Sequence, residues 1–297
     1  MNKSLIALAA MLAMGAAHAE DTLKKIKDSG AVTMGVRESS GALSYTLGDG
    51  KYTGFHVEIC TRALADIQKQ LGLAKMETKY QPVTSGNRIP LVQNGTVDIE
   101  CGSTTNNATR QKDVAFAVTT FVEEVRIAVK ANSGITNIAQ LAGKTVATTT
   151  GTTSVQTLRK HERATGVDLK EVFGKDHADS FLLLESGRAD AFVMDGAILA
   201  GNIAKAKTPA DFKIVGEVLS VEPIAIMMRK DDPAFKKAVD DSIKAMIKSG
   251  DMAKLWDKWF LQPIPPTNTK VGLAVSDSTK AAWANPNDKP MEDYAKK

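Results

Sequence analysis

Short polar stretches that could contact a small ligand separate the apolar segments of this 297-residue sequence. In the first half of the chain they are residues 37–40, 85–88, 102–107 and Arg110. In the second half they are residues 151–154, His177 and 194–195. Each stretch follows a predicted strand or begins a predicted helix, which is where an α/β fold presents groups to a ligand in a cleft. The pattern therefore predicts a ligand cleft.

Enzyme signatures are missing from these stretches. Gly143-Lys144-Thr145 suggests a phosphate-binding loop, but Ile138 stands where the first glycine of that motif is required. No HExxH, GxSxG or GxGxxG string occurs. His177, Asp179 and Ser180 lie too close in sequence to favour the geometry of a catalytic triad. We therefore expect no catalytic residue, no metal ion and no cofactor.

The composition is that of a globular protein, with 24% charged and 43% hydrophobic residues. Lysine and arginine (38) barely exceed aspartate and glutamate (34), and a net charge of +4 is too small to indicate nucleic-acid binding. Two cysteines are too few for a cysteine-rich zinc module or a dense disulfide scaffold. We expect no nucleic-acid partner.

Residues 1–19 have the pattern of a secretory signal peptide. Lys3 provides the positive charge, residues 5–16 the apolar run, and Ala17-His18-Ala19 the small-x-small cleavage site. The run is too short to span a membrane. A buried first helix is the alternative. We expect export to the periplasm with cleavage after Ala19.

Cys60 and Cys101 are the only cysteines, and an oxidising compartment permits a disulfide between them. Cys60 lies in a predicted helix and Cys101 at the end of a predicted strand. Two separately buried thiols are an equal alternative, because the sequence does not supply the Cα separation.

The apolar pattern alternates between strands and amphipathic helices, which predicts α/β layers. The predicted strands are 31–37, 76–83, 97–101, 114–120, 123–130, 145–149, 169–173, 191–194, 212–215 and 223–229. The predicted helices are 55–71, 89–93, 135–141, 151–163, 180–187, 197–207, 233–248 and 252–260. From Gln262 onward, three prolines predict an irregular surface strap.

The same order of elements occurs twice, which predicts two lobes. Lobe I comprises residues 20–121 and 220–297, and lobe II, residues 122–219, is inserted into it. The insertion requires two crossings, near Thr120 and Ser220. Two parallel crossings form a hinge, and a hinge implies a cleft between the lobes.

Several strings resemble the glutamate/aspartate-binding branch of the solute-binding proteins of bacterial ABC transporters. They are RESS (37–40), TSGNRIPLVQNGT (84–96), ECGSTTNN (100–107), GTTS (151–154), KDHADSF (175–181), LESGRA (184–189), WDKWF (256–260) and PIPP (263–266). The resemblance covers the chain after residue 19 in one order. It implies the type II periplasmic binding protein fold, two α/β lobes joined by a two-segment hinge.

The resemblance also implies three sub-sites for a dicarboxylic amino acid. Arg110, Thr105 and Thr153 hold the α-carboxylate. Asp195 and the Ser103 carbonyl hold the α-ammonium. The side-chain carboxylate is held by Arg37, Ser85, Arg88 and His177. Residues 41–43 (GAL) differ from the proline and aromatic that relatives commonly have beside Arg37, which leaves the preference between glutamate and aspartate open.

Charge supports this assignment, because three guanidinium groups and one carboxylate match a ligand with two anionic groups and one cationic group. Arginine suits carboxylates since its planar fork donates two parallel hydrogen bonds. A buried ammonium needs a counter-charge such as Asp195. The sequence leaves open whether His177 is neutral or charged; a charged His177 would favour the anion and tighten binding below about pH 6.5.

We therefore predict a periplasmic receptor, monomeric and not an enzyme, that closes on L-glutamate or L-aspartate. It would deliver the ligand to an ABC permease complex in the inner membrane. One alternative is a periplasmic enzyme on the same scaffold, a dehydratase of prephenate- or arogenate-type acids, for which His177 and Glu38 are the nearby acid–base candidates. A sensor module that presents its ligand-bound form to a receptor is a second alternative.

Overall fold

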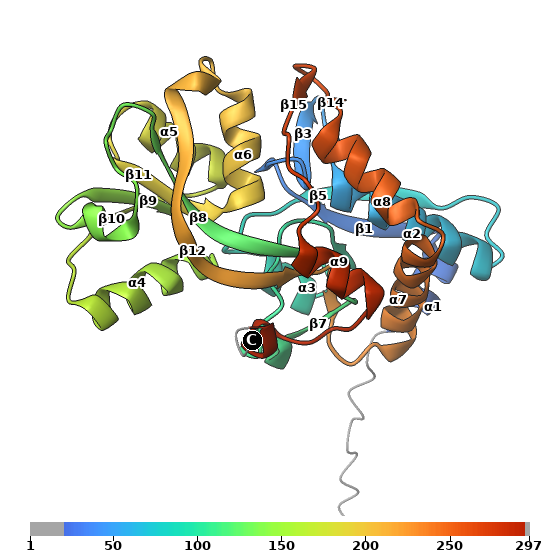
Figure 1. Ribbon diagram of the computed structural model, residues 1–297. Helices are drawn as coiled ribbons and strands as arrows, with labels where there is room; N and C mark the ends of the chain where they lie inside the picture. Colours follow the sequence, from blue (N-terminus) through green and yellow to red (C-terminus); the bar gives the residue numbers. More distant parts are fainter. Residues whose placement is uncertain (1–20, 295–297) are drawn as a thin grey trace, which may run out of the picture.

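The computed structural model describes residues 21–294, so the predicted signal peptide, residues 1–19, lies outside the described residues. Two five-stranded mixed sheets with helices packed around them dominate the chain (Figure 1). Within the described residues, no helix is long and apolar enough to span a membrane.

The first sheet has the strand order β5-β1-β6-β13-β7. Its central strand β1 pairs in parallel with β5 and β6, whereas β13 is antiparallel to β6 and β7. The residues of these strands are β1 Ala31–Val36, β5 Glu77–Pro82, β6 Ile99–Glu100, β7 Val114–Phe116 and β13 Met227–Arg229.

The second sheet has the order β10-β9-β11-β8-β12. Strand β9 is parallel to β10 and β11, and β8 is antiparallel to β11 and β12. The strands are β8 Phe121–Lys130, β9 Thr145–Thr149, β10 Lys170–Gly174, β11 Ala191–Asp195 and β12 Phe212–Ile224. In both sheets, loops at the carboxyl ends of the parallel strands carry polar side chains.

Ten helices are present in residues 21–294. In Figure 1, α4–α6 surround the second sheet, while α1, α2, α7 and α8 lie with the first. Their bounds are α1 Thr22–Ser29, α2 Phe55–Gln70, α3 Arg88–Gln93, α4 Thr153–Thr165, α5 His177–Glu185, α6 Gly196–Lys205, α7 Pro233–Lys248, α8 Asp251–Trp256, α9 Asp277–Ala284 and α10 Met291–Tyr294. Helix α8 continues into a π-helical turn, Asp257–Leu261.

Strands β8 and β12 connect the two sheets (Figure 1). They pair as an antiparallel ladder whose register begins at Phe121 and Ile224, and the Thr120 amide donates to the Ile224 carbonyl at 3.1 Å. A two-strand ribbon is thus the covalent path between the sheets. We call Phe121–Val125 and Ser220–Ile224 the crossing strands.

The expectation of an irregular strap after Gln262 is wrong. Strands β14 (Pro263–Ile264) and β15 (Thr269–Lys270) pair, and α9 and α10 follow. Helix α9 packs on the crossing strands, because the Thr279 hydroxyl accepts from the Val122 amide (3.1 Å) and the Trp283 indole donates to the Thr120 carbonyl (2.8 Å). The C-terminal segment therefore braces the connection between the sheets.

Cys60 and Cys101 form a disulfide across a Cα–Cα distance of 6.3 Å. The bond joins α2 to the end of β6, and both residues are fully buried. This selects the bridge over the alternative of two separate thiols.

Two features were not predicted from the sequence. Helix α1 precedes the first strand, and a small antiparallel sheet of β2 (Ser39–Ser40), β3 (Ser44–Gly48) and β4 (Lys51–Thr53) follows it. The turn between β2 and β3 brings Gly41 against α6, because a Cβ on Gly201 would lie 2.6 Å from the Gly41 Cα atom. Helix α6 therefore contacts the turn between β2 and β3 at Gly201, where there is no room for a side chain.

Candidate functional site

The predicted site residues lie together between the two sheets. On the first sheet's side, Arg37 follows β1, and Ser103 and Thr105 follow β6. Ser85 precedes α3, Arg88 begins it, and Arg110 begins a short 3₁₀ helix. Those from the second sheet's side begin α4 (Thr153), begin α5 (His177) or end β11 (Asp195). All are buried except Arg110, which is half-buried.

Hydrogen bonds on the first sheet's side hold the arginines in place. Arg37 donates to the hydroxyls of Ser85 (3.0 Å) and Ser103 (3.3 Å). Arg88 donates to the Ser103 carbonyl at 3.1 Å, and Arg110 to the Thr105 carbonyl at 2.9 Å. The Nε atoms of Arg37 and Arg88 are buried and have no hydrogen-bond partner among the described residues. Each of these two guanidinium groups therefore retains a donor for a further acceptor.

Contacts between the two sides show that the cleft is closed. Arg37 forms an ion pair with Asp176 (2.5 Å) and a hydrogen bond with His177 Nε2 (3.2 Å), and the Ser39 hydroxyl donates to Asp176 (2.8 Å). At the other end of the cleft, Arg110 donates to the Gly151 carbonyl at 3.3 Å. The lobes thus meet at Arg37 and again at Arg110.

The positive charge of Arg88 is disfavoured by its surroundings in this closed form. Burial, and then the charges of Arg110 and Arg37, lower the pKa of Arg88 to about 9. A guanidinium group disfavoured by burial and by two neighbouring guanidinium groups is suited to bind an anion, because a bound carboxylate relieves the repulsion.

The buried side chain of Asp195 is suited to a nearby cation. Its side chain is 1% exposed, and Oδ1 has no hydrogen-bond partner among the described residues. Burial and then Glu222 raise the pKa of Asp195 to about 8. Although Asp195 precedes α6, its side chain makes no capping hydrogen bond, so capping does not explain its position. A buried carboxylate of this kind is stabilised by a cation brought next to it.

Of the two protonation states that the sequence left open for His177, the structure favours the neutral one, and therefore no tightening of binding below about pH 6.5. Burial and then Arg37 lower the pKa of His177 to about 3. Its Nε2 accepts from Arg37, which leaves Nδ1 to donate to the Thr149 hydroxyl at 3.1 Å. His177 thereby fixes the orientation of Arg37.

The predicted count of one carboxylate in the cleft is also wrong. Asp176 pairs with Arg37, while Glu100, Glu123 and Glu222 are buried at its walls. These acids lie in strands or next to the start of α5. The strings that carry the resemblance include Glu100 and Asp176 without assigning them a role, and they do not include Glu123 or Glu222. The signal that could have found them is a charged residue inside a strand that is otherwise apolar.

The acid–base chemistry of the dehydratase alternative is not assembled. His177 does not contact Asp179 or Ser180 as a triad requires; Ser180 instead bonds to the Thr149 hydroxyl (2.8 Å) and the Thr148 carbonyl (3.0 Å). Glu38 is exposed. Within residues 21–294 no group of three or more His, Cys, Asp or Glu side chains is arranged to hold a metal ion.

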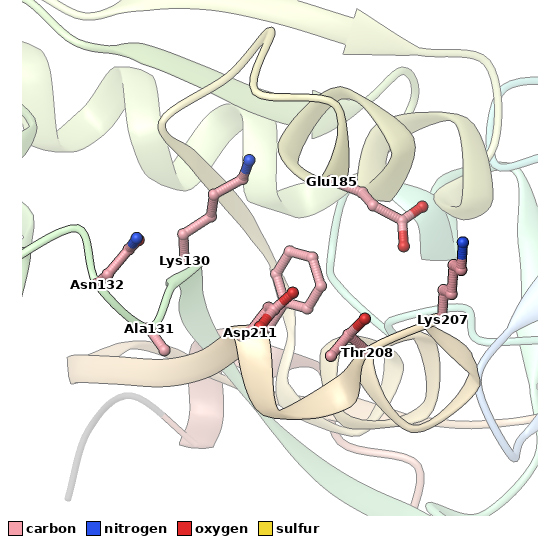
Figure 2. Close-up of a pocket in the computed structure, with 8 residues that line it drawn as sticks. Lys130, Ala131, Asn132, Glu185, Lys207, Thr208 and Asp211 are labelled. Carbon is pink, nitrogen blue, oxygen red and sulfur yellow. The ribbon is translucent and has the colours of Figure 1, made fainter.

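A pocket of about 530 Å³ lies elsewhere on the second sheet's side (Figure 2). Lys130 and Lys207 line it together with Glu185 and Asp211, so its charges balance, and it contains none of the predicted site residues. Two other pockets reach the cleft: one of about 550 Å³ includes Thr153, and one of about 530 Å³ includes Arg110. The pocket in Figure 2 therefore lacks the excess of positive charge that the three arginines provide in the cleft.

Two α/β lobes around a closed, charged cleft define the type II periplasmic binding protein fold. Residues 32–262 match the model of bacterial extracellular solute-binding proteins, family 3, and the chain belongs to this family.

Three relatives place the chain more finely. The glutamate/aspartate import solute-binding protein of Escherichia coli K12 is 44% identical over 291 residues, 96% of each chain. The L-glutamate/L-aspartate-binding protein of Pseudomonas aeruginosa is 45% identical over 273 residues, covering 91% of this chain and 90% of its own. Among solved structures, an L-cysteine solute receptor of Neisseria gonorrhoeae has a TM-score of 0.71 at 27% identity, over 80% of this chain and 93% of its own.

Proposed function

We propose that this protein is a periplasmic receptor that binds L-glutamate or L-aspartate and delivers it, as a monomer, to an ABC permease complex in the inner membrane. The proposal includes removal of residues 1–19 by cleavage after Ala19. The observation that carries it is the set of three arginines around one closed cleft. Burial and the charges of Arg110 and Arg37 disfavour the Arg88 guanidinium, and Asp195 Oδ1 has no hydrogen-bond partner among residues 21–294. The names of the relatives at 44–45% identity support the same ligands.

In this proposal each ligand charge meets an opposite charge. The α-carboxylate binds Arg110 and the first amides of α4, where Thr105 and Thr153 contribute to the wall and the helix dipole favours an anion. The α-ammonium binds Asp195 and the Ser103 carbonyl. The side-chain carboxylate binds Arg88, Arg37 and Ser85, with His177 orienting Arg37.

Closure in this proposal is a hinge motion of lobe I (residues 20–121 and 220–297) against lobe II (residues 122–219). A ligand that bridges both lobes stabilises the closed form only through contacts that the open form lacks. Thr153, His177 and Asp195 belong to lobe II and Arg37, Arg88 and Arg110 to lobe I, so a bound amino acid contacts both.

A thermal-shift panel tests the function directly. Glutamate and aspartate at about 100 times their dissociation constants should each add about 2.7 kcal/mol to the free energy of unfolding. Glutamine and asparagine should add little, because an amide facing Arg88 leaves a buried charge unpaired at a cost of about 3–5 kcal/mol. Histidine, arginine, succinate and prephenate complete the panel. Stabilisation by a neutral or basic amino acid, with none by the acidic pair, would contradict the proposal.

The contact between Gly201 and Gly41 gives a second test, since it exists only when the lobes are closed. Gly201→Ala should strengthen α6, because alanine is favoured over glycine in a helix by about 1 kcal/mol. Its Cβ would meet the Gly41 Cα at 2.6 Å, so closure becomes harder. We expect glutamate to bind at least about tenfold more weakly, given a typical overpacking cost of 1–3 kcal/mol.

Titration calorimetry measures the affinity of the Gly201→Ala variant, and thermal unfolding without ligand serves as the control. The variant should unfold at a temperature no lower than the wild type. Unchanged affinity would mean that the lobes close without this contact.

A further inference from the structure

Two buried glutamates face each other on the crossing strands. Glu123 of β8 and Glu222 of β12 are register partners, 3% and 0% exposed. Directly opposed residues of an antiparallel pair project from the same face. Both side chains are therefore held at the connection between the lobes, beside the cleft.

The two glutamates have different partners. Glu123 accepts from the backbone amides of Glu124 (2.9 Å) and Ala197 (3.2 Å). Glu222 instead accepts from side chains of the site: Oε2 accepts from the hydroxyls of Thr105 (2.6 Å) and Thr153 (2.7 Å). The Ser220 hydroxyl donates to Oε1 at 2.8 Å. Glu222 thus joins a threonine from each side of the cleft through one oxygen.

These hydrogen bonds determine what the threonine hydroxyls offer a ligand. A hydroxyl has one hydrogen to donate, and a carboxylate oxygen has none. Because both hydrogens point to Glu222, the Thr105 and Thr153 hydroxyls, 3.4 Å apart, present only lone pairs to other groups. Lone pairs attract an ammonium and repel a carboxylate.

We propose that Glu222 is a positioning residue that takes the hydroxyl hydrogens of Thr105 and Thr153 and so makes both hydroxyls acceptors for the α-ammonium. The α-carboxylate is then held by Arg110 and the backbone amides at the start of α4, not by the two hydroxyls. This inference rests on the proposed function, because it assigns a sub-site of the same amino-acid ligand.

The electrostatics of Asp195 place Glu222 at the ammonium sub-site. Glu222 is the largest charge that raises the pKa of Asp195, ahead of the opposing effects of Arg88 and Arg110. Asp195 Oδ1, which has no partner among the described residues, and the two threonine oxygens together supply acceptors from three elements. An ammonium donates three hydrogen bonds and matches such a set.

Glu222→Gln tests the inference with two ligands, glutamate and glutarate. Glutarate has both carboxylates and lacks the ammonium. The amide of glutamine is uncharged and accepts through one atom only, so it holds the hydroxyl hydrogens of Thr105, Thr153 and Ser220 more weakly than the two carboxylate oxygens do. We expect glutamate affinity to fall at least about tenfold, equivalent to 1.4 kcal/mol, while glutarate affinity changes by less than about threefold. The readout is the ratio of the two affinities by calorimetry, which a general loss of structure does not change selectively.

Glu123→Gln is the matched control, since it makes the same substitution at the register partner. Glu123 forms a hydrogen bond with neither threonine hydroxyl in the described structure, and burial raises its pKa well above the usual value. Both ligands should bind this variant within about threefold of wild type.

Thr153→Val is a second variant that does not depend on how Glu222→Gln folds. Valine keeps the shape of threonine and the backbone amide, so the affinity for glutamate should fall and the affinity for glutarate should not. Parallel losses for both ligands, in either variant, would overturn the inference, as would an unchanged ratio. If the wild-type protein binds neither acidic amino acid, the proposed function is overturned and the inference with it. If the wild type binds glutamate but a variant loses affinity for glutamate and glutarate in parallel, only the inference is overturned.

Discussion

Replacing Arg88 with alanine is expected to abolish glutamate binding. Arg88 is 2% exposed and faces a cleft in which a ligand carboxylate would be its counter-charge. Truncating one partner of a buried charge pair costs about 3–5 kcal/mol, a loss of affinity of more than about 100-fold. Titration calorimetry with L-glutamate gives the measurement.

The ligand-free Arg88→Ala variant should still fold cooperatively. In the wild type, burial and the charges of Arg110 and Arg37 disfavour the Arg88 guanidinium, so its removal relieves repulsion. Arg62→Ala is the control, because Arg62 is a half-buried arginine of α2 that pairs with Glu58 and not with any residue of the predicted site. If Arg88→Ala retains wild-type affinity, Arg88 does not belong to the ligand site.

Local patterns identified the positions of most cleft residues. Helix α2 begins at Phe55 after Gly54, as its apolar spacing predicts, and Thr153 begins α4 after a strand. The resemblance selected the arginines. Such features are readable because each depends on a short segment: a strand end, a glycine before a helix, or a string of site residues.

Long-range pairing could not be read in this way. Glu123 and Glu222 face each other only because β8 and β12 pair in one register, and a shift of one residue would place the two side chains on opposite faces. Asp176 was passed over because its pairing with Arg37 needs the lobes to close. The error after Gln262 has a local cause: prolines dominated the prediction, although Ser276 caps α9 by accepting from the Thr279 amide.

Asp195→Asn should separate ligand binding from stability. Asparagine preserves the shape of the side chain and removes the charge that a buried ammonium requires. Glutamate affinity should therefore fall by more than about 100-fold, from the loss of a buried counter-charge of about 3–5 kcal/mol. If the Asp195→Asn variant binds glutamate with an affinity within threefold of the wild type, Asp195 does not belong to the ammonium sub-site.

The sign of the pH effect follows from the raised pKa of Asp195, about 8 in the folded protein against an ordinary value of 3.8. The folded state binds the proton more tightly than the unfolded chain, so the stabilisation is complete below pH 3.8 and is lost as pH rises to 8. Ligand-free Asp195→Asn should thus equal the wild type in stability near pH 4 and exceed it increasingly up to pH 8. Thermal unfolding across this range measures the difference.

Ligand binding must reverse this effect, because an ammonium next to Asp195 favours the ionised carboxylate. Below pH 8 the wild type should release a proton when glutamate binds, and its affinity should weaken on acidification by up to about tenfold per pH unit. Calorimetry in buffers of different ionisation enthalpy detects that proton. A gain in affinity on acidification would contradict both the ionised Asp195 and the neutral His177. The stability lost by burying Asp195 is thus recovered only when a cation occupies the cleft, which ties closure to an amino-acid ligand.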